Sequence, residues 1–254
     1  MEGGSGYERE VVRIAVLMPA YNEERRVART LGELGELRAE APEHSVTVFL
    51  VDDGSEPPVD EDALAAAAGG LEVIVARHGV NLGQGAALET ARRLALLEDA
   101  RRAPARYDAF VTMDSDGQHR AEDVIRLATA VLEGADVALG DRFAGGSLVP
   151  PARARLLFLA RLFERLTTGL SLSDAHNGLR AFGLRALERI HITQNRMAHA
   201  TELTRSISRA GLRVVEVPVS VRYTEATLAK GQRASGAVSI LLDLLHGFLF
   251  EERS

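Results

Sequence analysis

Residues 107–119 of this chain read YDAFVTMDSDGQH, and this stretch decides the fold class. Its first half is an apolar run with the length of a buried strand, and its second half is a polar loop. Asp114 and Asp116 stand one residue apart where the strand ends, so both carboxylates can face one crevice at the edge of a sheet. Carboxylate oxygens placed in this way suit Mg²⁺ or Mn²⁺ carrying a diphosphate. The alternative is an acidic loop that caps a helix beginning near Ala121.

Three other apolar runs end in polar motifs in the same manner. Runs at 13–17, 46–50 and 71–76 lead into MPAYNEE at 18–24, VDDGS at 51–55 and NLGQGAA at 81–87. Helical patterns fall at 23–39, 60–68, 83–99 and 121–133, and a further strand is expected at 136–140. This alternation of strands and helices predicts an α/β fold with a mostly parallel central sheet flanked by helices.

The pattern changes after Pro150 and Pro151. A long helix is expected from there to about residue 169, followed by a strand at 179–182, strands within 213–223 and an apolar C-terminal helix within 233–254. No stretch is long enough to link separate domains, so residues 12–232 are predicted to form one domain, with a first part at 12–140 and a second at 141–232. Residues 1–11 are polar and glycine-rich and are expected to be disordered.

Composition limits the class of protein. The net charge of −6 argues against general nucleic-acid binding, and the absence of cysteine excludes disulfides and thiol catalysis. No apolar run has the roughly 20 residues that span a bilayer. The apolar stretch at 237–250 is expected to pack on the core or on a second subunit, as in a homodimer, or to contact a membrane surface.

Lys230 is the only lysine of the chain, and it falls in a polar motif. All asparagines and glutamines of the chain also fall in polar motifs. The 30 basic residues are otherwise arginines, and the four asparagines and four glutamines are Asn22, Asn81, Asn177, Asn195, Gln84, Gln118, Gln194 and Gln232. Lysine and arginine are not equivalent where a compact charge is needed. We therefore interpret these positions as places where the residue type matters.

The order of the motifs resembles the family 2 glycosyltransferases, in particular the dolichol-phosphate mannose synthase-like and bacterial polyprenyl-phosphate branch. The resemblance covers about residues 12–232 and continues through SDAHNGLR at 173–180, QNRMAHATE at 194–202, VRYT at 221–224 and KGQ at 230–232. It implies a GT-A fold and an inverting transfer of a sugar from a UDP-, GDP- or dTDP-linked donor. The implied acceptor is a polyprenyl phosphate or a saccharide, in cell-envelope glycan synthesis in the cytoplasm, at the inner face of the membrane.

The resemblance also implies roles for single residues on the donor side. The metal would be held by Asp114, Asp116 and Gln118. The nucleotide sugar would contact Pro19, Ala20, Tyr21, Glu23, Asp53, Gly83, Gln84, Asp114 and Ser115. The alternative for Asp53 is an Asx-turn with Gly54 and Ser55. Gly83 and Gly85 open a helix without a third glycine in dinucleotide spacing, which excludes a Rossmann cofactor site.

A concentrated polar set in an otherwise apolar region usually lines a pocket. Here we expect it to form the acceptor side, with Asp174 taking part in catalysis; the set is Asp174, His176, Asn177 and Arg180, with Gly178 allowing close approach of the sugar. His199 and Glu202 stand three apart on one face of a predicted helix. His199 would face the acceptor. Glu202 would be the general base for a hydroxyl acceptor, or would orient the donor or an arginine for a phosphate acceptor. The alternative is a pair that only packs or is solvated.

Three basic residues are expected to contribute positive charge to catalysis. Arg142 follows the strand at 136–140, where it would bind an anionic acceptor or the donor diphosphate; the alternative is a surface ion pair. Arg222 and Lys230 flank the stretch 224–229, which would close over the donor and bring charge to its phosphates.

Two other enzyme classes share parts of this pattern. In haloacid dehalogenase-type phosphatases the nucleophilic aspartate would correspond to Asp114, but Gln118 replaces the threonine of their motif and the motif lies in the middle of the chain. Sugar nucleotidylyltransferases open with a basic glycine-rich loop, whereas residues 19–24 are acidic.

Overall fold

The computed structural model describes residues 11–104, 106–146, 168–174, 177–194 and 198–222, together with residues 158, 162 and 165. For residues 198–201 it describes the backbone alone. The expectations for Lys230, His176, the side chain of His199, the stretch 224–229 and the segments 1–10 and 233–254 fall outside these residues, as does most of the helix predicted before residue 169.

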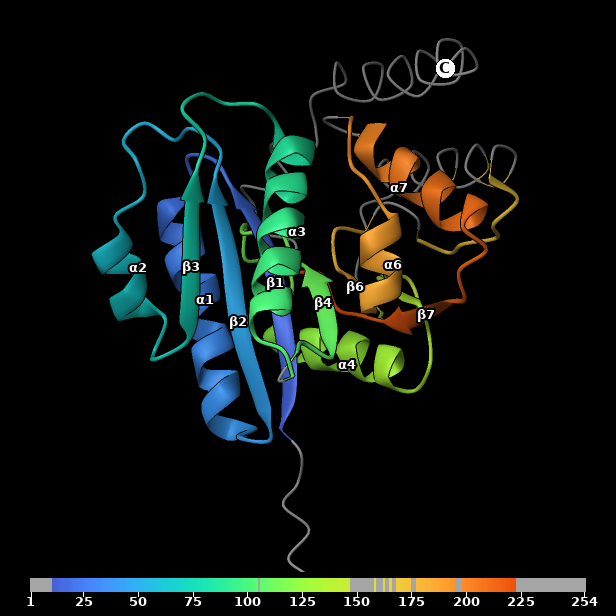
Figure 1. The fold of residues 1–254 in the computed structure, drawn as a ribbon, viewed down its shortest axis with the longest axis horizontal. Coiled ribbons are helices and arrows are strands. Elements are labelled where there is room, and N and C mark those ends of the chain that lie inside the picture. Colours follow the sequence, from blue (N-terminus) through green and yellow to red (C-terminus); the bar gives the residue numbers. More distant parts are fainter. Residues whose placement is uncertain are drawn as a thin grey trace, which may run out of the picture.

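Seven strands form one sheet in the order β3-β2-β1-β4-β6-β5-β7 (Figure 1). The strands are β1 (Val12–Ala20), β2 (His44–Asp52), β3 (Glu72–Arg77), β4 (Ala109–Thr112), β5 (Val137–Asp141), β6 (Arg180–Phe182) and β7 (Val214–Pro218). Each neighbouring pair is parallel except those made by β6, which runs antiparallel to both β4 and β5. The predicted mostly parallel sheet is confirmed.

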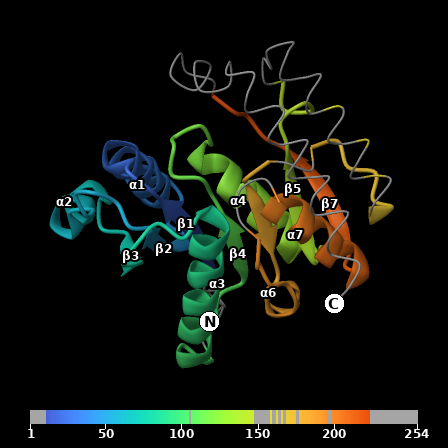
Figure 2. The same cartoon turned by 90° about the horizontal axis from the view of Figure 1, so that it is seen from above.

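Helices cover both faces of the sheet, as Figure 2 shows from above. They are α1 (Glu24–Glu40), α2 (Glu61–Ala67), α3 (Gln84–Arg101), α4 (Ala121–Leu132), α6 (Leu184–Arg189) and α7 (Ala198–Arg209). Helices α1, α2 and α4 pack on one face, and α3, α6 and α7 pack on the other. Within the described part of the chain, no helix has both the length and the apolar character needed to cross a bilayer.

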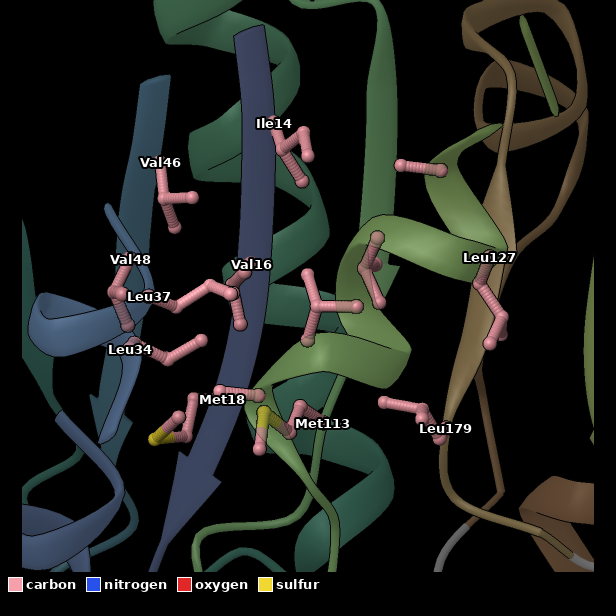
Figure 3. Packing of buried hydrophobic residues seen from close by; sticks show 14 of the residues in the cluster. Ile14, Val16, Met18, Leu34, Leu37, Val46, Val48, Met113, Leu127 and Leu179 are labelled. Atoms are coloured by element: carbon pink, nitrogen blue, oxygen red, sulfur yellow. The ribbon is translucent and has the colours of Figure 1, made fainter. Parts of the chain in front are cut away.

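Strand β1 shows why the sheet is buried on both faces. Residues 14–20 are all buried, as expected for a central parallel strand with helices on each side. Successive side chains alternate between the two layers, so Ile14 and Val16 join the cluster with Leu34 of α1, whereas Leu17 joins the cluster with Ala91 of α3. Figure 3 shows the first of these clusters, in which the side chains of α1 and α4 meet those of β1 and β2.

The second part of the chain completes the sheet begun by the first. Strand β6 inserts between β4 and β5, and β7 extends the sheet beyond β5. The predicted parts 12–140 and 141–232 therefore share one sheet in a single α/β domain, and the boundary between their roles stays a prediction. Sequence periodicity gave no sign that the short strand β6 would be antiparallel.

The prediction of several strands within 213–223 is wrong for the described residues, which form one strand. This strand, β7, ends at Pro218. The N–H of Val219 still donates to the Asp141 carbonyl of β5 at 3.0 Å, but the backbone after Val219 bonds to α4 and to the loop 114–119. The N–H of Ser220 donates to Asp123 at 2.9 Å, and the N–H of Arg222 donates to the carbonyl of Gln118 at 2.8 Å. Val221 forms an isolated antiparallel bridge with His119. Asp123 is fully buried on α4, and sequence reasoning did not single it out.

Two loops at the carboxyl edge of the sheet touch at Gly54. The residue has a φ of +75°, and a Cβ there would lie 2.5 Å from the backbone carbon of Val80. Glycine is therefore required both by the backbone conformation and by the close approach of the β3–α3 loop. Gly211 also has a positive φ, +61°, but a Cβ there would meet nothing within 4 Å.

Gly54→Ala and Gly211→Ala are a matched pair. Both variants place a side chain in the left-handed region, at a cost of about 1–2 kcal/mol. Gly54→Ala also forces backbone against backbone, which adds roughly 1–3 kcal/mol. Urea unfolding should therefore show the larger loss of stability for Gly54→Ala. Equal losses would show that the two loops do not pack at Gly54 as described.

Candidate functional site

The predicted metal loop follows β4 at the carboxyl edge of the sheet. The Gln84 side chain, in the first turn of α3, donates to Asp114 Oδ1 at 2.8 Å, and His119 Nε2 lies 3.6 Å from Asp114 Oδ2. Helix α4 begins at Ala121 without a hydrogen bond from a capping side chain. Asp114 and Asp116 therefore do not cap α4, and that alternative is set aside.

Gly178 packs directly against the carboxylate of Asp114. A Cβ at Gly178 would lie 2.3 Å from Asp114 Oδ2, and the Thr112 hydroxyl donates to the Gly178 carbonyl at 2.8 Å. The approach of a sugar to Gly178 stays a prediction. The structure adds a reason for glycine here, because any side chain would displace Asp114.

Asp116 is partly buried beside Asp114. Burial raises the pKa of Asp116, and the negative charge of Asp114 raises it further, although hydrogen bonds from Gln118 and the proximity of His119 oppose the rise. The Gln118 backbone N–H donates to Asp116 Oδ1 at 3.0 Å, and its side-chain amide donates to Oδ2. Gln118 and Asp116 are both metal ligands implied by the family resemblance, and here they contact each other.

These residues fit a divalent cation that is shared with a substrate. Two neighbouring carboxylates repel each other unless a cation lies between them, and Mg²⁺ is often held by one or two carboxylates together with substrate phosphates. No group of three His, Asp or Glu side chains within the described ranges could hold a metal unaided. The donor set therefore suits a metal that arrives with a diphosphate better than a permanent structural ion.

Asp53 organises the loop between β3 and α3. Its carboxylate accepts hydrogen bonds from the N–H groups of Leu82 at 2.9 Å and Gly83 at 2.7 Å, and lies 2.7 Å from His78 Nδ1. His78 Nε2 in turn lies 2.9 Å from the Thr90 hydroxyl of α3. His78 escaped sequence reasoning, because its role depends on a partner 25 residues away. Contact between Asp53 and the nucleotide stays a prediction.

The N–H of Ser55, which would close the Asx-turn considered for Asp53, has another acceptor. The N–H of Ser55 donates to Asp52 Oδ1 at 2.9 Å. The carboxylate of Asp53 points instead toward the β3–α3 loop.

The other predicted donor residues lie around the ends of β1 and β4. Pro19, Ala20 and Ser115 are buried, Tyr21 is exposed, and Glu23 pairs with Arg26 at 2.6 Å. A hollow of about 390 Å³ opens beside them, lined by Asn22, Glu23, Glu24, Arg25, Arg26, Ser55, Glu56, Pro57 and Val59. The predicted donor residues are thus brought to one edge of the sheet.

Arg142 and Asp174 form a buried ion pair, not a surface pair. Arg142 Nε lies 2.5 Å from Asp174 Oδ2, and the Arg142 N–H donates to the same oxygen at 3.1 Å. The Asn177 amide donates to it at 3.3 Å, whereas Asp174 Oδ1 is buried and has no hydrogen-bond partner among the described residues. Glu216 of β7 holds this loop by accepting the N–H of Ser173 at 2.6 Å.

Arg180 lies between the two groups of polar residues. It starts β6, where it pairs with Thr112 of β4 on one side and Leu139 of β5 on the other. The end of β4, which leads to Asp114, and the end of β5, which leads to Arg142, are therefore separated by the width of one strand. The metal loop and the Arg142–Asp174 pair share one edge of the sheet.

Arg222 and Glu202 make contacts that sequence reasoning did not predict. The Arg222 guanidinium donates to both carboxylate oxygens of Glu33 on α1, at 2.8 and 2.9 Å. Glu202, on the predicted helix that is now α7, accepts the N–H groups of Thr193 and Gln194, each at 2.9 Å, and the Thr193 hydroxyl. Glu202 is therefore not merely packed, and it anchors the loop before α7. The catalytic roles of both residues stay predictions.

The sequence and the fold have informative relatives. Undecaprenyl-phosphate mannosyltransferase of Micrococcus luteus is 32% identical over 89% of this chain and 90% of its own length. Polyprenol monophosphomannose synthase of Mycolicibacterium smegmatis is 31% identical over 90% of this chain and 86% of its own length. Among solved structures, glucosyl-3-phosphoglycerate synthase of Mycobacterium tuberculosis, crystallised with phosphoglyceric acid, superposes with a TM-score of 0.63 at 19% identity. The superposition covers 97% of this chain and 85% of the chain of the solved structure.

The fold of the chain is that of the GT-A glycosyltransferases, as the solved structure shows. The sequence profile described as Glycosyl transferase family 2 matches residues 15–190, which is more than half of the chain. Together with the two mannosyltransferases, this match shows that the chain belongs to glycosyl transferase family 2.

Proposed function

We propose that this glycosyltransferase moves a sugar from a nucleoside-diphosphate sugar to a polyprenyl phosphate, with inversion at the anomeric carbon. The observation that carries the proposal is the pair Asp114 and Asp116 at the end of β4, one strand's width from the end of β5 and Arg142. The similarity to the two mannosyltransferases, which are named for polyprenyl-phosphate acceptors, supports a polyprenyl phosphate over a saccharide. Membership of family 2 makes a phosphatase or a nucleotidylyltransferase the weaker alternatives.

On the donor side, the diphosphate would lie between β4 and α3. Helix N-termini favour anions, and the first turn of α3 approaches Asp114 through Gln84. Asp114, Asp116 and Gln118 would hold Mg²⁺ or Mn²⁺, which neutralises charge on the departing diphosphate. A solved relative in complex with Mn²⁺ and UDP supports this assignment. Asp53 keeps the loop before α3 in place for the nucleotide.

On the acceptor side, Arg142 is the candidate for binding the lipid phosphate. In the transfer, an acceptor phosphate oxygen forms a bond to the anomeric carbon while the bond from that carbon to the donor diphosphate breaks on the opposite face. The attacking oxygen is already ionised at neutral pH, so this reaction needs no general base. A lipid acceptor would place the reaction at the inner face of the cell membrane, where its phosphate meets the cytoplasm.

If Asp116 is a metal ligand, Asp116→Asn should change both the stability of the protein and its response to Mn²⁺. A raised pKa in the folded state means that ionised Asp116 lowers stability as pH rises through and above the usual aspartate range. The variant should therefore raise the melting temperature of the metal-free protein at pH 7. It should also lose the stabilisation by Mn²⁺, which at 100 times its Kd would be about 2.7 kcal/mol in the parent protein. Thermal unfolding with EDTA or Mn²⁺, at pH 5 and pH 7, measures both effects.

Asp62→Asn is the control for this experiment, because Asp62 is an exposed acid on α2. The control should keep the response to Mn²⁺ at pH 7 and should not gain stability in EDTA. A parent protein that Mn²⁺ does not stabilise, in the presence of UDP or GDP, would contradict the metal assignment.

The acceptor makes a prediction for Glu202→Gln. Loss of a general base costs on the order of 10²–10⁴-fold in kcat. With a phosphate acceptor we expect a loss below about 10²-fold, caused by a poorer anchor for Thr193 and Gln194, because glutamine replaces one acceptor oxygen with an amide donor. The pH profile of kcat/KM should keep its shape. The assay measures the transfer of labelled sugar from a panel of UDP-, GDP- and dTDP-sugars to undecaprenyl phosphate.

Glu188→Gln, an exposed change on α6, is the matched control and should behave as the parent protein does. Loss of the acid limb of the pH profile in Glu202→Gln alone, with transfer to saccharides but not to the lipid, would assign Glu202 as a general base and the acceptor as a hydroxyl.

A further inference from the structure

A buried ion pair lies in the middle of α3, away from the metal loop. Arg92 donates to both carboxylate oxygens of Glu89, through Nε at 2.8 Å and NH2 at 2.8 Å. Both side chains are almost fully buried, at 6% and 11% exposure. The proposed transfer reaction uses neither residue, and their burial calls for a physical account.

Both members of the pair bind the segment that follows β6. Arg92 NH1 donates to the Leu187 carbonyl of α6 at 3.0 Å, and Arg92 NH2 lies 3.1 Å from His191 Nδ1. The N–H of Ile192 donates to Glu89 at 3.2 Å. Figures 1 and 2 show α6 beside α3 in this region. Residues 187–192 are thus attached to α3 at three points.

The same segment is held from its other side by Glu202. The carboxylate of this α7 residue accepts the N–H groups of Thr193 and Gln194. Residues 187–194 therefore connect two helices through charged hydrogen bonds, with α3 on one side and α7 on the other. Charge-assisted hydrogen bonds are roughly twice as strong as neutral ones, and they fix geometry as well as distance.

The Glu89 carboxylate is ionised under all ordinary conditions. Burial alone would raise its pKa, but hydrogen bonds from Arg92, Arg93 and the Ile192 N–H lower the pKa to about 2. A buried ion pair generally adds little stability over apolar residues of the same volume. What this pair supplies is a fixed orientation of the backbone of residues 187–192.

We infer that Glu89 and Arg92 are positioning residues of the transfer reaction. They fix the segment 187–194, and through it Glu202 on α7, relative to the helix whose first turn carries Gln84 beside Asp114. The pair thereby sets the position of α7, which carries Glu202 and the predicted acceptor residue His199, relative to the donor side of the site. This inference rests on the proposed function, and it assigns a role to two residues that touch neither substrate.

The chain offers a matched control in Arg93. Its side chain is 73% exposed and donates to the same Glu89 carboxylate at 2.7 Å. Arg92 makes additional contacts with Leu187 and His191, and lysine cannot reproduce them, because it lacks the planar fork of the guanidinium. Arg92→Lys and Arg93→Lys both keep a positive charge beside Glu89.

The experiment compares these two variants in steady-state kinetics with undecaprenyl phosphate, and in calorimetric binding of the donor nucleotide with Mn²⁺. Misplacement of a reacting group by about 1 Å can cost on the order of 10²-fold. Arg92→Lys should therefore lose at least about tenfold in kcat/KM for the acceptor, while its Kd for the nucleotide stays within about twofold of the parent value. Arg93→Lys should match the parent protein in both measurements.

Glu89→Asp provides a second variant that keeps the negative charge but shortens its reach to Ile192. It should show the same split between kinetics and nucleotide binding as Arg92→Lys, and it keeps the test decisive if Arg92→Lys does not fold. Equal kinetics of the Arg92 and Arg93 variants, or a parallel loss of nucleotide affinity, would overturn the positioning role. Absence of transfer by the parent protein, with nucleotide binding intact, would instead contradict the proposed acceptor.

Discussion

Two like charges at the end of one buried strand constrain the whole site. Strand β4 lies between β1 and β6, and each of its four residues is buried, so the chain reaches solvent only where the strand ends. Asp114 and Asp116 stand at that point, close enough that the charge of one raises the pKa of the other. Gln84, Gln118 and His119 surround the pair with polar groups, and the absence of a side chain at Gly178 leaves room for it.

The strand ends could be predicted from the sequence because their signals are local. Continuous apolar runs mark strands that are buried on both faces, and a polar motif follows each run where the parallel strands meet one edge. Asp53, Asp114 and Arg142 were placed at this edge for that reason. The expected helices at 23–39 and 83–99 also agree with α1 and α3 to within two residues.

The remaining features depend on pairing between distant elements, which local patterns do not encode. Strand β6 has three residues and pairs with strands on both sides, so its antiparallel direction has no periodic signature. His78 acquires a role through Asp53 and Thr90, and Glu89 binds the N–H of Ile192, which is 103 residues away. Arg222 was predicted to bring positive charge to the donor phosphates, yet its guanidinium forms an ion pair with Glu33 of α1.

Charged pairs, in addition to apolar packing, join elements of the site that are distant in sequence. The Arg142–Asp174 pair links the end of β5 to the loop before β6. The Glu89–Arg92 pair links α3 to residues 187–192, which follow β6. Apolar contacts tolerate small shifts, whereas a charged hydrogen bond in a buried setting weakens steeply as its geometry changes. A transferase must hold a donor and an acceptor within reach of one carbon atom, and these pairs fix the elements that would carry them.

The central claim is that Asp114 and Asp116 form a metal and diphosphate site at the end of β4. An anomalous difference map from a crystal grown with Mn²⁺ and UDP or GDP tests it most directly. We expect a peak between the nucleotide diphosphate and at least one of the two carboxylates, with metal–oxygen distances of roughly 2.1 Å. A bound nucleotide whose diphosphate lies away from these carboxylates, with no metal beside them, would contradict it.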